Sequence, residues 1–314
     1  MSRIYSALKV LDEARAARLA AHDGSGVMAA DAAAASDGRL LEPDTVPVEE
    51  EAKKLDNPVI EFPKSRDCEP HAEYRTVGLR VAKGPLLPFD GSDARTAEQY
   101  RLIRTNLMLH AARPKMIAVS SASPGDGKTV TTVNLSAALA LKSESTVIMV
   151  DGDMRQKKLG ISLGIKAEPG LADVLRGRCR LDEAIVRIEE MPNLLLLPSG
   201  STTANPAELL DSPEWKALTT RLRALFTYVV IDTTPVAAVA DFQLVQQASD
   251  GVLLVLRPDH TKRSIFQRAL QNVAPDKLLG TVLNAVPDWF LCNTRENDYY
   301  YTEKYEGIAK GPKN

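Results

Sequence analysis

The order of hydrophobic and polar residues predicts alternating strands and helices from about residue 93 onward. Continuous apolar runs indicate buried strands near residues 115–121, 146–150, 194–198, 228–232, 251–256 and 278–284. Segments with helical spacing lie between most of these runs, for example from Thr129 to Leu141. This alternation is typical of stacked βαβ units. Since crossovers between parallel strands are short and right-handed, we expect an α/β fold with a doubly wound, mostly parallel sheet.

The two ends of the chain follow other patterns. Apolar residues recur at helical spacing in the first segment, which predicts a short amphipathic helix. The next segment is rich in Ala, Asp, Glu, Gly and Pro, a composition typical of a flexible linker. The last segment is polar and rich in tyrosine. The predicted helix, linker, folded domain and tail are residues 1–22, 23–90, 91–286 and 287–314.

A loop suited to bind phosphate lies between the first predicted strand and the helix after it. Residues 121–129 read Ser-Ala-Ser-Pro-Gly-Asp-Gly-Lys-Thr, with Ala122 where the usual motif has its first glycine. Small residues let backbone N–H groups point at a polyanion, while lysine reaches the outer phosphates and a hydroxyl binds magnesium. An ordinary Gly/Pro turn is the alternative for this segment alone. The predicted nucleotide contacts are Pro124, Gly125, Asp126, Gly127, Lys128, Thr129 and Val130.

Two other predicted strands end in aspartates. The second strand run leads into Asp151 and Asp153, and the fourth ends in Asp232. Ligands of an open parallel sheet bind beyond the carboxyl ends of its strands, so all three carboxylates are expected near the phosphate loop. Each aspartate alone could instead begin an Asx turn. In combination with the loop, they predict a nucleotide site of the P-loop NTPase type.

Charge and composition narrow the possible functions. The chain of 314 residues has a formal net charge of −2, which argues against a nucleic-acid groove. No apolar run approaches the ~20 residues that span a bilayer, and charged residues interrupt the N-terminal segment, so a cytoplasmic protein is expected. The cysteines lack metal-ligand spacing and predict reduced thiols, and the scattered histidines predict surface residues rather than ligands. These residues are Cys68, Cys179, Cys292, His22, His71, His110 and His260.

Several motifs along the domain, together with the tail, carry a resemblance to a known family. Besides the phosphate loop, they are Ala-Glu-Gln-Tyr-Arg-Leu-Ile-Arg-Thr-Asn-Leu at 97–107, Val-Asp-Gly-Asp-Met-Arg at 150–155, Asn-Pro-Ala-Glu-Leu-Leu at 205–210 and Ile-Asp-Thr-Thr-Pro at 231–235. Residues 95–312 thereby resemble the cytoplasmic kinase domain of bacterial tyrosine kinases that regulate capsule and exopolysaccharide export. The opening residues also resemble stand-alone members found beside exosortase-linked clusters. Two positions depart from the family pattern: Gly152 replaces a common alanine and Thr234 a usual second proline.

The resemblance implies a protein-tyrosine kinase that uses ATP and Mg²⁺ and phosphorylates its own tail in trans. Lys128 would neutralise the β and γ phosphates. Asp151 would orient the phenol and accept its proton late, with Asp153 in support. The implied magnesium ligands are Thr129, Asp153 and Asp232. The implied autophosphorylation sites are Tyr299, Tyr300, Tyr301 and Tyr305.

The resemblance also implies partners. Glu98, Arg101 and Arg104 share one helix face, which by itself indicates a solvated charge stripe. In the family, this face favours contact with the next subunit of a ring-like homo-oligomer. A separate inner-membrane adaptor of the chain-length-determinant type would activate the kinase and hold it at the membrane, and a cognate tyrosine phosphatase is a further implied partner.

Two other functions stay open on the sequence. A ParA/MinD-like positioning ATPase shares the sheet and the acidic strand ends. Those ATPases carry an early loop lysine that reaches across a dimer, however, and Ser123 stands at that position here. The other alternative is a scaffold that binds ATP only to assemble with a polysaccharide transporter. The intact Asp151, Asp153 and Asp232 count against a scaffold without catalysis.

Overall fold

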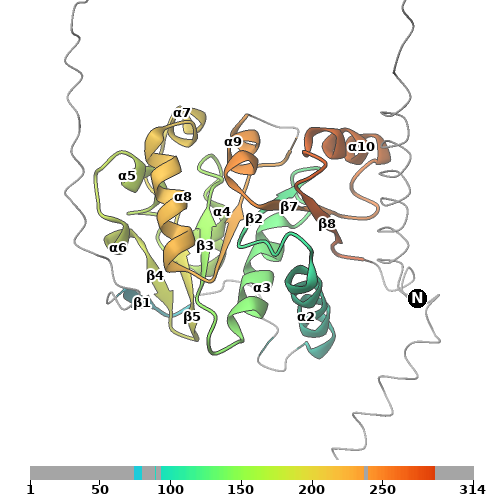
Figure 1. Ribbon diagram of the computed structural model, residues 1–314, viewed down its shortest axis with the longest axis horizontal. Helices are drawn as coiled ribbons and strands as arrows, with labels where there is room; N and C mark the ends of the chain where they lie inside the picture. The colour runs from blue at the N-terminus through green and yellow to red at the C-terminus, as the bar shows by residue number, and fades with distance from the viewer. Residues whose placement is uncertain (1–73, 80–88, 90–92, 237–239, 287–314) are drawn as a thin grey trace, which may run out of the picture. The chain divides into compact units, whose positions relative to one another are not determined.

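An eight-stranded sheet forms the centre of the computed structural model, which describes residues 74–79, 89, 93–236 and 240–286 (Figure 1). The strand order is β1-β4-β5-β3-β6-β2-β7-β8. All neighbouring strands are parallel except β4 and β5, so the predicted mostly parallel α/β sheet is confirmed. The strands are β1 Arg75–Val77, β2 Met116–Ser121, β3 Val147–Asp151, β4 Val186–Ile188, β5 Met191–Leu197, β6 Tyr228–Asp232, β7 Gly251–Leu256 and β8 Leu278–Leu283.

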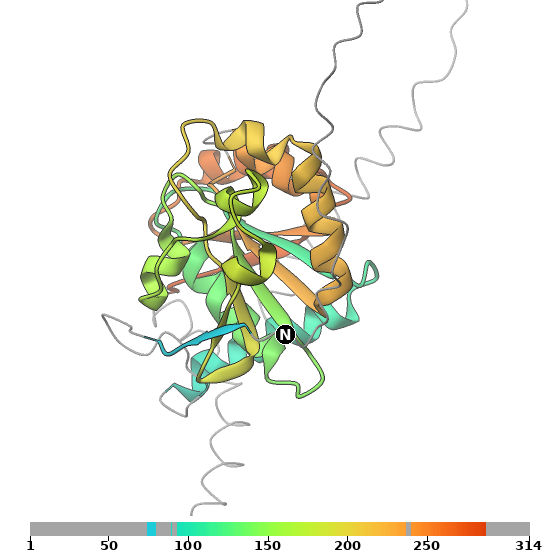
Figure 2. The same cartoon turned by 90° about the vertical axis from the view of Figure 1, so that its left-hand side faces the viewer.

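Helices cover both faces of the sheet (Figure 2). One apolar cluster packs helices α2, α3 and α4 against one face, and it includes Tyr100, Leu135 and Leu163. A second cluster, which includes Trp215 and Phe242, packs the remaining helices against the other face. The helices are α2 Ala94–Leu109, α3 Lys128–Ala140, α4 Lys158–Leu163, α5 Leu171–Leu175, α6 Leu181–Ala184, α7 Pro206–Leu210, α8 Pro213–Leu225, α9 Asp241–Ala248 and α10 Arg263–Asn272.

Two short strands differ from the sequence prediction. Strand β1 lies inside the segment assigned to the linker, and it pairs in parallel with β4 through Arg75 and Val186. Strand β4 in turn pairs antiparallel with β5. Each has only three residues, too few for a hydrophobic period to emerge. The predicted N-terminal helix, most of the linker, and the tyrosine tail lie outside the described residues.

The central strands bring the predicted site residues to one edge of the sheet. Strand β6 lies between β3 and β2, and Asp151 is the register partner of Asp232. The backbone N–H of Gly152 donates to the carbonyl oxygen of Asp232 at 2.9 Å, which joins the two strand ends. A Cβ at Gly152 would lie 2.8 Å from that oxygen, so glycine permits this close approach.

Candidate active site

The phosphate loop is shaped by glycines and opens directly into α3. Gly125 and Gly127 have φ values of 90° and 98°, in the left-handed region that side chains disfavour. Gly127 is the N-cap of α3 and provides no side-chain cap, so the backbone N–H groups of the first turn stay available for an anion. The N–H of Ala122 donates to the Val255 carbonyl at 3.2 Å, which attaches the loop to β7. Ala122, which replaces the usual first glycine, is buried, with 3% of its surface exposed.

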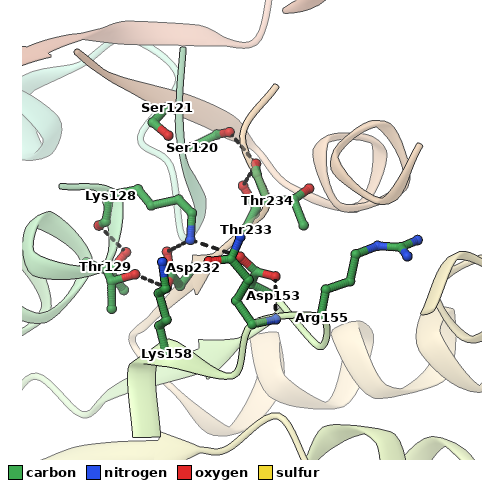
Figure 3. A network of polar contacts seen from close by, with 12 residues as sticks. Ser120, Ser121, Lys128, Thr129, Asp153, Arg155, Lys158, Asp232, Thr233 and Thr234 are labelled. Atoms are coloured by element: carbon green, nitrogen blue, oxygen red, sulfur yellow. Dashed lines mark hydrogen bonds and ion pairs between the residues drawn. The ribbon is translucent and has the colours of Figure 1, made fainter. Parts of the chain in front are cut away.

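Lys128 extends from α3 into a group of carboxylates (Figure 3). Its Nζ donates to Asp153 Oδ2 at 3.0 Å and lies 3.7 Å from Asp232 Oδ1. Burial alone would lower the pKa of this lysine, but the negative charges of Asp232 and Asp153 outweigh burial and raise it. The side chain is therefore a stable cation in the place where the outer phosphates of a nucleotide are expected.

Asp151 is the most perturbed group of the site. It is fully buried, and neither carboxyl oxygen has a hydrogen-bond partner among the described residues. Burial, followed by the charges of Asp232 and Asp153, raises the pKa of Asp151 to about 8. The Gly160 N–H and the Lys128 ammonium oppose this rise, although neither makes a hydrogen bond to the carboxyl group by distance and angle. Such an unpartnered carboxyl group is costly, which is typical of catalytic positions.

Asp232 joins the lysine and the hydroxyl of the loop. Its Oδ2 accepts a hydrogen bond from Thr129 Oγ1 at 2.7 Å, and its Oδ1 has no hydrogen-bond donor among the described residues. Burial raises the pKa of Asp232 to about 6, against the lowering effects of Lys128 and Thr129. Thr129, Asp232 and Asp153 thus surround Lys128 from two strand ends and the start of α3.

The residues present fit a magnesium–nucleotide complex. Three buried carboxyl groups share one lysine, so further positive charge would stabilise their ionised forms. Among the residues that the structure describes, no three His, Cys, Asp or Glu side chains are arranged to hold a metal ion by themselves. Magnesium commonly takes one or two carboxylates and completes its shell with water and phosphate oxygens. A hydroxyl with one or two carboxylates meets that preference.

A second polar cluster holds the other side of the loop, and we call it the Asp126 clamp. Asp126 is fully buried, and its carboxylate accepts from the Ser123 N–H at 2.7 Å, from His260 Nδ1 at 2.9 Å and from Thr261 Oγ1 at 2.5 Å. Asn284 Nδ2 donates to the Asp126 carbonyl oxygen at 2.9 Å. The clamp therefore consists of Asp126, Ser123, His260, Thr261 and Asn284.

No local sequence motif indicates the partners of Asp126 in the clamp. The prediction that the histidines are surface residues holds only in part for His260, whose side chain is 42% exposed but contacts Asp126. Thr261 follows β7 and Asn284 follows β8. The sequence could have indicated these two partners only through their place after strands that end at the same sheet edge as the loop. The described cysteine, Cys179, is a free thiol, and burial raises its pKa to about 11.

Side chains beyond the carboxylates fix the strand ends. Arg155 points away from the lysine (Figure 3) and binds Asp241 through Nε at 2.8 Å and Nη2 at 3.1 Å. Ser120 Oγ donates to the Thr234 carbonyl oxygen at 2.7 Å, while the Thr234 hydroxyl has no partner among the described residues. Thr234 thus replaces the usual proline while its carbonyl group still links β2 to the segment after β6.

The predicted oligomer face divides into two kinds of contact. Arg101 pairs with Glu98 at 3.1 Å on the exposed side of α2, and its guanidinium lies 5.9 Å from the ring centre of Phe89. Arg104 instead donates to the Ala138 carbonyl oxygen of α3 at 3.0 Å, within the same chain. The interface role of all three stays a prediction.

Comparisons with known proteins agree with this geometry. A family model described as an AAA domain matches residues 114–273. The tyrosine-protein kinase YwqD of Bacillus subtilis is 33% identical over 66% of this chain and 87% of its own length. The chain belongs to the bacterial tyrosine-protein kinase family.

Other relatives of this kinase family cover the same domain. CpsD, a tyrosine-protein kinase of Streptococcus agalactiae, is 29% identical over 62% of this chain and 84% of its own length. The crystal structure of the chimerical protein CapA2B2 superposes with a TM-score of 0.61 and 28% identity, over 68% of this chain and 94% of that one. The kinase domain of the Escherichia coli tyrosine kinase Etk gives a TM-score of 0.58 and 26% identity, over 66% and 82% of the two chains. No helix in the described part of the chain is long and apolar enough to cross a membrane.

Proposed function

We propose that this bacterial tyrosine kinase transfers the γ-phosphoryl group of ATP to the tail tyrosines of a neighbouring copy of the chain, at Tyr299, Tyr300, Tyr301 and Tyr305. The observation that carries the proposal is the position of Lys128, held at the start of α3 between Asp153 and Asp232 with Asp151 beside them. A phosphate-binding loop supplies the place for the nucleotide. Family membership supports tyrosine as the acceptor.

The reaction requires positioning and charge compensation more than covalent help. The phenol oxygen of the acceptor forms a bond to the γ-phosphorus, and the bond from that phosphorus to the β–γ bridging oxygen breaks. The products are phosphotyrosine and ADP, and the phenolic proton leaves to a base. Lys128 and the N–H groups at the start of α3 would offset the charge on the phosphate oxygens.

Asp151 is suited to accept that proton. With ordinary pKa values near ~10 for tyrosine and ~3.9 for aspartate, full transfer would cost roughly 8 kcal/mol. In the metal-free protein, burial raises the pKa of Asp151 to about 8, which brings it closer to the pKa of the phenol. Asp151 therefore orients the phenol and takes the proton late, as the phosphorus–oxygen bond forms.

Magnesium would be held by Thr129 and Asp232 with Asp153 in support, and it would neutralise charge on the nucleotide phosphates. Thr129 and Asp232 contact each other, so the hydroxyl and the carboxylate would be close enough to hold the same cation. Asp153 keeps Lys128 in place through the 3.0 Å ion pair.

The wider role follows from the same family. We propose that the kinase regulates capsule or exopolysaccharide polymerisation and export, as a ring-like homo-oligomer with Glu98, Arg101 and Arg104 in the subunit contact. An inner-membrane adaptor of the chain-length-determinant type would activate it in the cytoplasm, and a tyrosine phosphatase would reverse the modification.

The test is a transfer assay between two forms of the full chain. The acceptor carries Lys128→Met, so that it cannot phosphorylate itself, and the enzyme is the wild type with ATP and magnesium. We expect phosphotyrosine in the tail of the acceptor, with none when the enzyme carries Asp151→Asn, although that variant still binds ATP. Nucleotide hydrolysis without any phosphotyrosine, with the adaptor segment added, would refute the kinase and favour a positioning ATPase.

A further inference from the structure

Three basic side chains and two hydroxyl groups meet next to the active site. Lys157 Nζ donates to Thr202 Oγ1 at 2.9 Å, and Arg176 Nη1 donates to Ser201 Oγ at 3.1 Å. Arg178 Nη1 reaches the same Ser201 oxygen at 3.4 Å. Ser201 and Thr202 follow β5, which neighbours β3 in the sheet, so the group lies at the edge that carries Asp151. We call these five residues the basic cradle.

The positive charges of the cradle lack close carboxylate partners. Nearby arginines are paired: Arg155 binds Asp241, and Arg180 binds Asp182. Within residues 93–236 and 240–286, no carboxylate oxygen lies within 4.0 Å of the charged nitrogens of Lys157, Arg176 or Arg178, all of which bind neutral hydroxyl groups instead. The cradle therefore presents one exposed cation, Arg178, and two half-buried cations, Lys157 and Arg176, that can accept acidic groups.

Asp173 reduces the positive field without cancelling it. Its Oδ2 accepts from the N–H groups of Gly170 and Ser201, at 3.1 Å and 3.0 Å. The carboxylate is thus used to hold the loop on which the cradle is built. Asp173 also interacts electrostatically with Arg178, so it offsets part of the positive charge of the cradle.

Backbone contacts link the cradle to the catalytic group. The Lys157 N–H donates to the Asp153 carbonyl oxygen at 2.9 Å, and the Asp153 carboxylate holds Lys128. Lys157 also has a φ of 51°, a left-handed conformation that costs a residue with a side chain about 1–3 kcal/mol. This strained backbone directs Lys157 at Thr202 rather than into a regular helix start, and such strain is concentrated at functional sites.

We infer that the basic cradle binds the acidic residues around the acceptor tyrosines of a second copy of this chain. The inference rests on the proposed function and adds the surface that selects the substrate. Charge complementarity identifies the occupant: residues 296–306 contain four acidic residues and one basic residue, Glu296, Asp298, Glu303, Glu306 and Lys304. Acidic residues on both sides of Tyr299 to Tyr301 match a positive surface beside the nucleotide site.

The physical consequence is a change in the affinity for the acceptor rather than in the chemical step. Contacts with residues flanking the tyrosine are equally strong before and at the transition state, so their loss raises KM and leaves kcat unchanged. Exposed ion pairs are individually weak and are screened by salt. Removal of three charges should raise the acceptor KM roughly tenfold at low ionic strength, and less as salt is added.

The experiment uses the full chain on both sides. The enzyme carries Tyr299→Phe, Tyr300→Phe, Tyr301→Phe and Tyr305→Phe, so that only the Lys128→Met acceptor receives phosphate. Lys157→Gln, Arg176→Gln and Arg178→Gln are combined in the enzyme, and initial rates are measured against acceptor and against ATP. We expect the KM for the acceptor to rise about tenfold. The kcat and the KM for ATP should stay within about twofold of the parent values.

A matched control removes the same charge elsewhere. Lys216→Gln, Arg221→Gln and Arg268→Gln are exposed residues on α8 and α10, and this triple variant should keep the parental acceptor KM. If the cradle variant has a lower unfolding midpoint, Arg178→Gln alone replaces it, because this exposed side chain makes only the longest of the three contacts.

A second experiment removes the acidic charges from the tail of the acceptor. Glu296→Gln, Asp298→Asn, Glu303→Gln and Glu306→Gln should raise KM for the parent enzyme but cause no further rise for the cradle variant, since both remove the same interaction. Independent, additive effects, an unchanged acceptor KM, or a raised KM for ATP would each overturn the cradle as a docking surface. Absence of transfer by the parent enzyme itself would instead refute the proposed function.

Discussion

Two buried aspartates, Asp126 within the phosphate loop and Asp151 at the end of β3, are in opposite environments. Asp126 accepts three hydrogen bonds, from Ser123, His260 and Thr261. Asp151 accepts none among the described residues, and burial raises its pKa to about 8. Both side chains belong to a well-packed, buried part of the domain.

The difference separates a residue that holds the site from one that acts in it. Satisfied buried polar groups fix a structure, whereas an unsatisfied one lowers the stability of the resting protein. Proteins keep such a group where the reaction requires it. The Asp126 clamp therefore accounts for the shape of the loop, and the carboxylates around Lys128 account for its chemistry.

The largest expected effect is the loss of the cation at the catalytic side. Lys128→Met should lower phosphotyrosine formation by at least about 10²- to 10³-fold, because charge stabilisation of the transferring phosphoryl group is lost. The measurement is the initial rate of acceptor phosphorylation under saturating ATP. Lys142→Met, an exposed lysine just beyond α3, is the control and should retain activity. A variant that keeps more than a tenth of the rate would mean that the phosphates bind elsewhere.

The next effect concerns the clamp side. A Cβ at Gly127 would lie 1.8 Å from Asn284 Nδ2, at a φ of 98°. Gly127→Ala should therefore lower the free energy of unfolding by more than the ~1–3 kcal/mol expected for backbone strain alone, and it should weaken ATP binding. Gly177→Ala isolates the strain, since that glycine has a φ of 67° and nothing within 4 Å of the added Cβ. If Gly127→Ala and Gly177→Ala lower the free energy of unfolding in urea by the same amount, Asn284 does not cover the loop.

The pH dependence of stability tests the carboxylates without any ligand. The folded pKa values of Asp151 and Asp232 are about 8 and about 6, above the value of 3.8 expected for the unfolded chain. Between the unfolded and folded pKa values, the folded protein therefore binds more protons than the unfolded chain. Its free energy of unfolding should fall as pH rises from about 5 to about 8. The slope is at most ~1.4 kcal/mol per pH unit for each group. In Asp151→Asn, the decline above pH 6 should flatten. An unchanged slope in metal-free buffer would contradict the assignment.

The smallest effect is expected for one clamp donor. His260→Ala removes one of three hydrogen bonds to Asp126 and should lower the free energy of unfolding by about 1 kcal/mol. The KM for ATP should rise a few-fold while kcat changes little, because the loop loses rigidity rather than a reacting group. His110→Ala serves for comparison, since that ring accepts a hydrogen bond from the Ala112 N–H before β2, whereas the loop follows β2. A fall in kcat alone would place His260 in the chemistry.

Much of the fold could be predicted because the central strands are buried on both faces. Strands such as β2 and β3 are continuous apolar runs, and their ends carry the aspartates that the parallel topology gathers. The three-residue strands β1 and β4 show no such run, and β1 pairs with β4 across more than a hundred residues of sequence. Short elements stabilised by distant partners leave little local signal.

The site shows the same division. Lys128, Thr129, Asp153 and Asp232 could be predicted from motif and strand ends, and the structure brings them together. The raised pKa values of Asp151 and Asp232 could not be predicted from the sequence, because they depend on burial and on the charges of neighbouring carboxylates. The bonds from His260 and Asn284 to Asp126 span 134 and 158 residues, so no local pattern announces them.

The most direct test is the unfolding free energy of two isosteric variants, Asp151→Asn and Asp126→Asn, in urea at pH 8 without metal or nucleotide. Asp151→Asn should stabilise the chain by about 1–2 kcal/mol, since it removes a carboxyl group that burial disfavours in its charged form. Asp126→Asn should destabilise it by about 1–3 kcal/mol, because an amide cannot accept from Ser123 and His260 at once. Shifts of the same sign would contradict the division of the loop into a holding side and a reacting side.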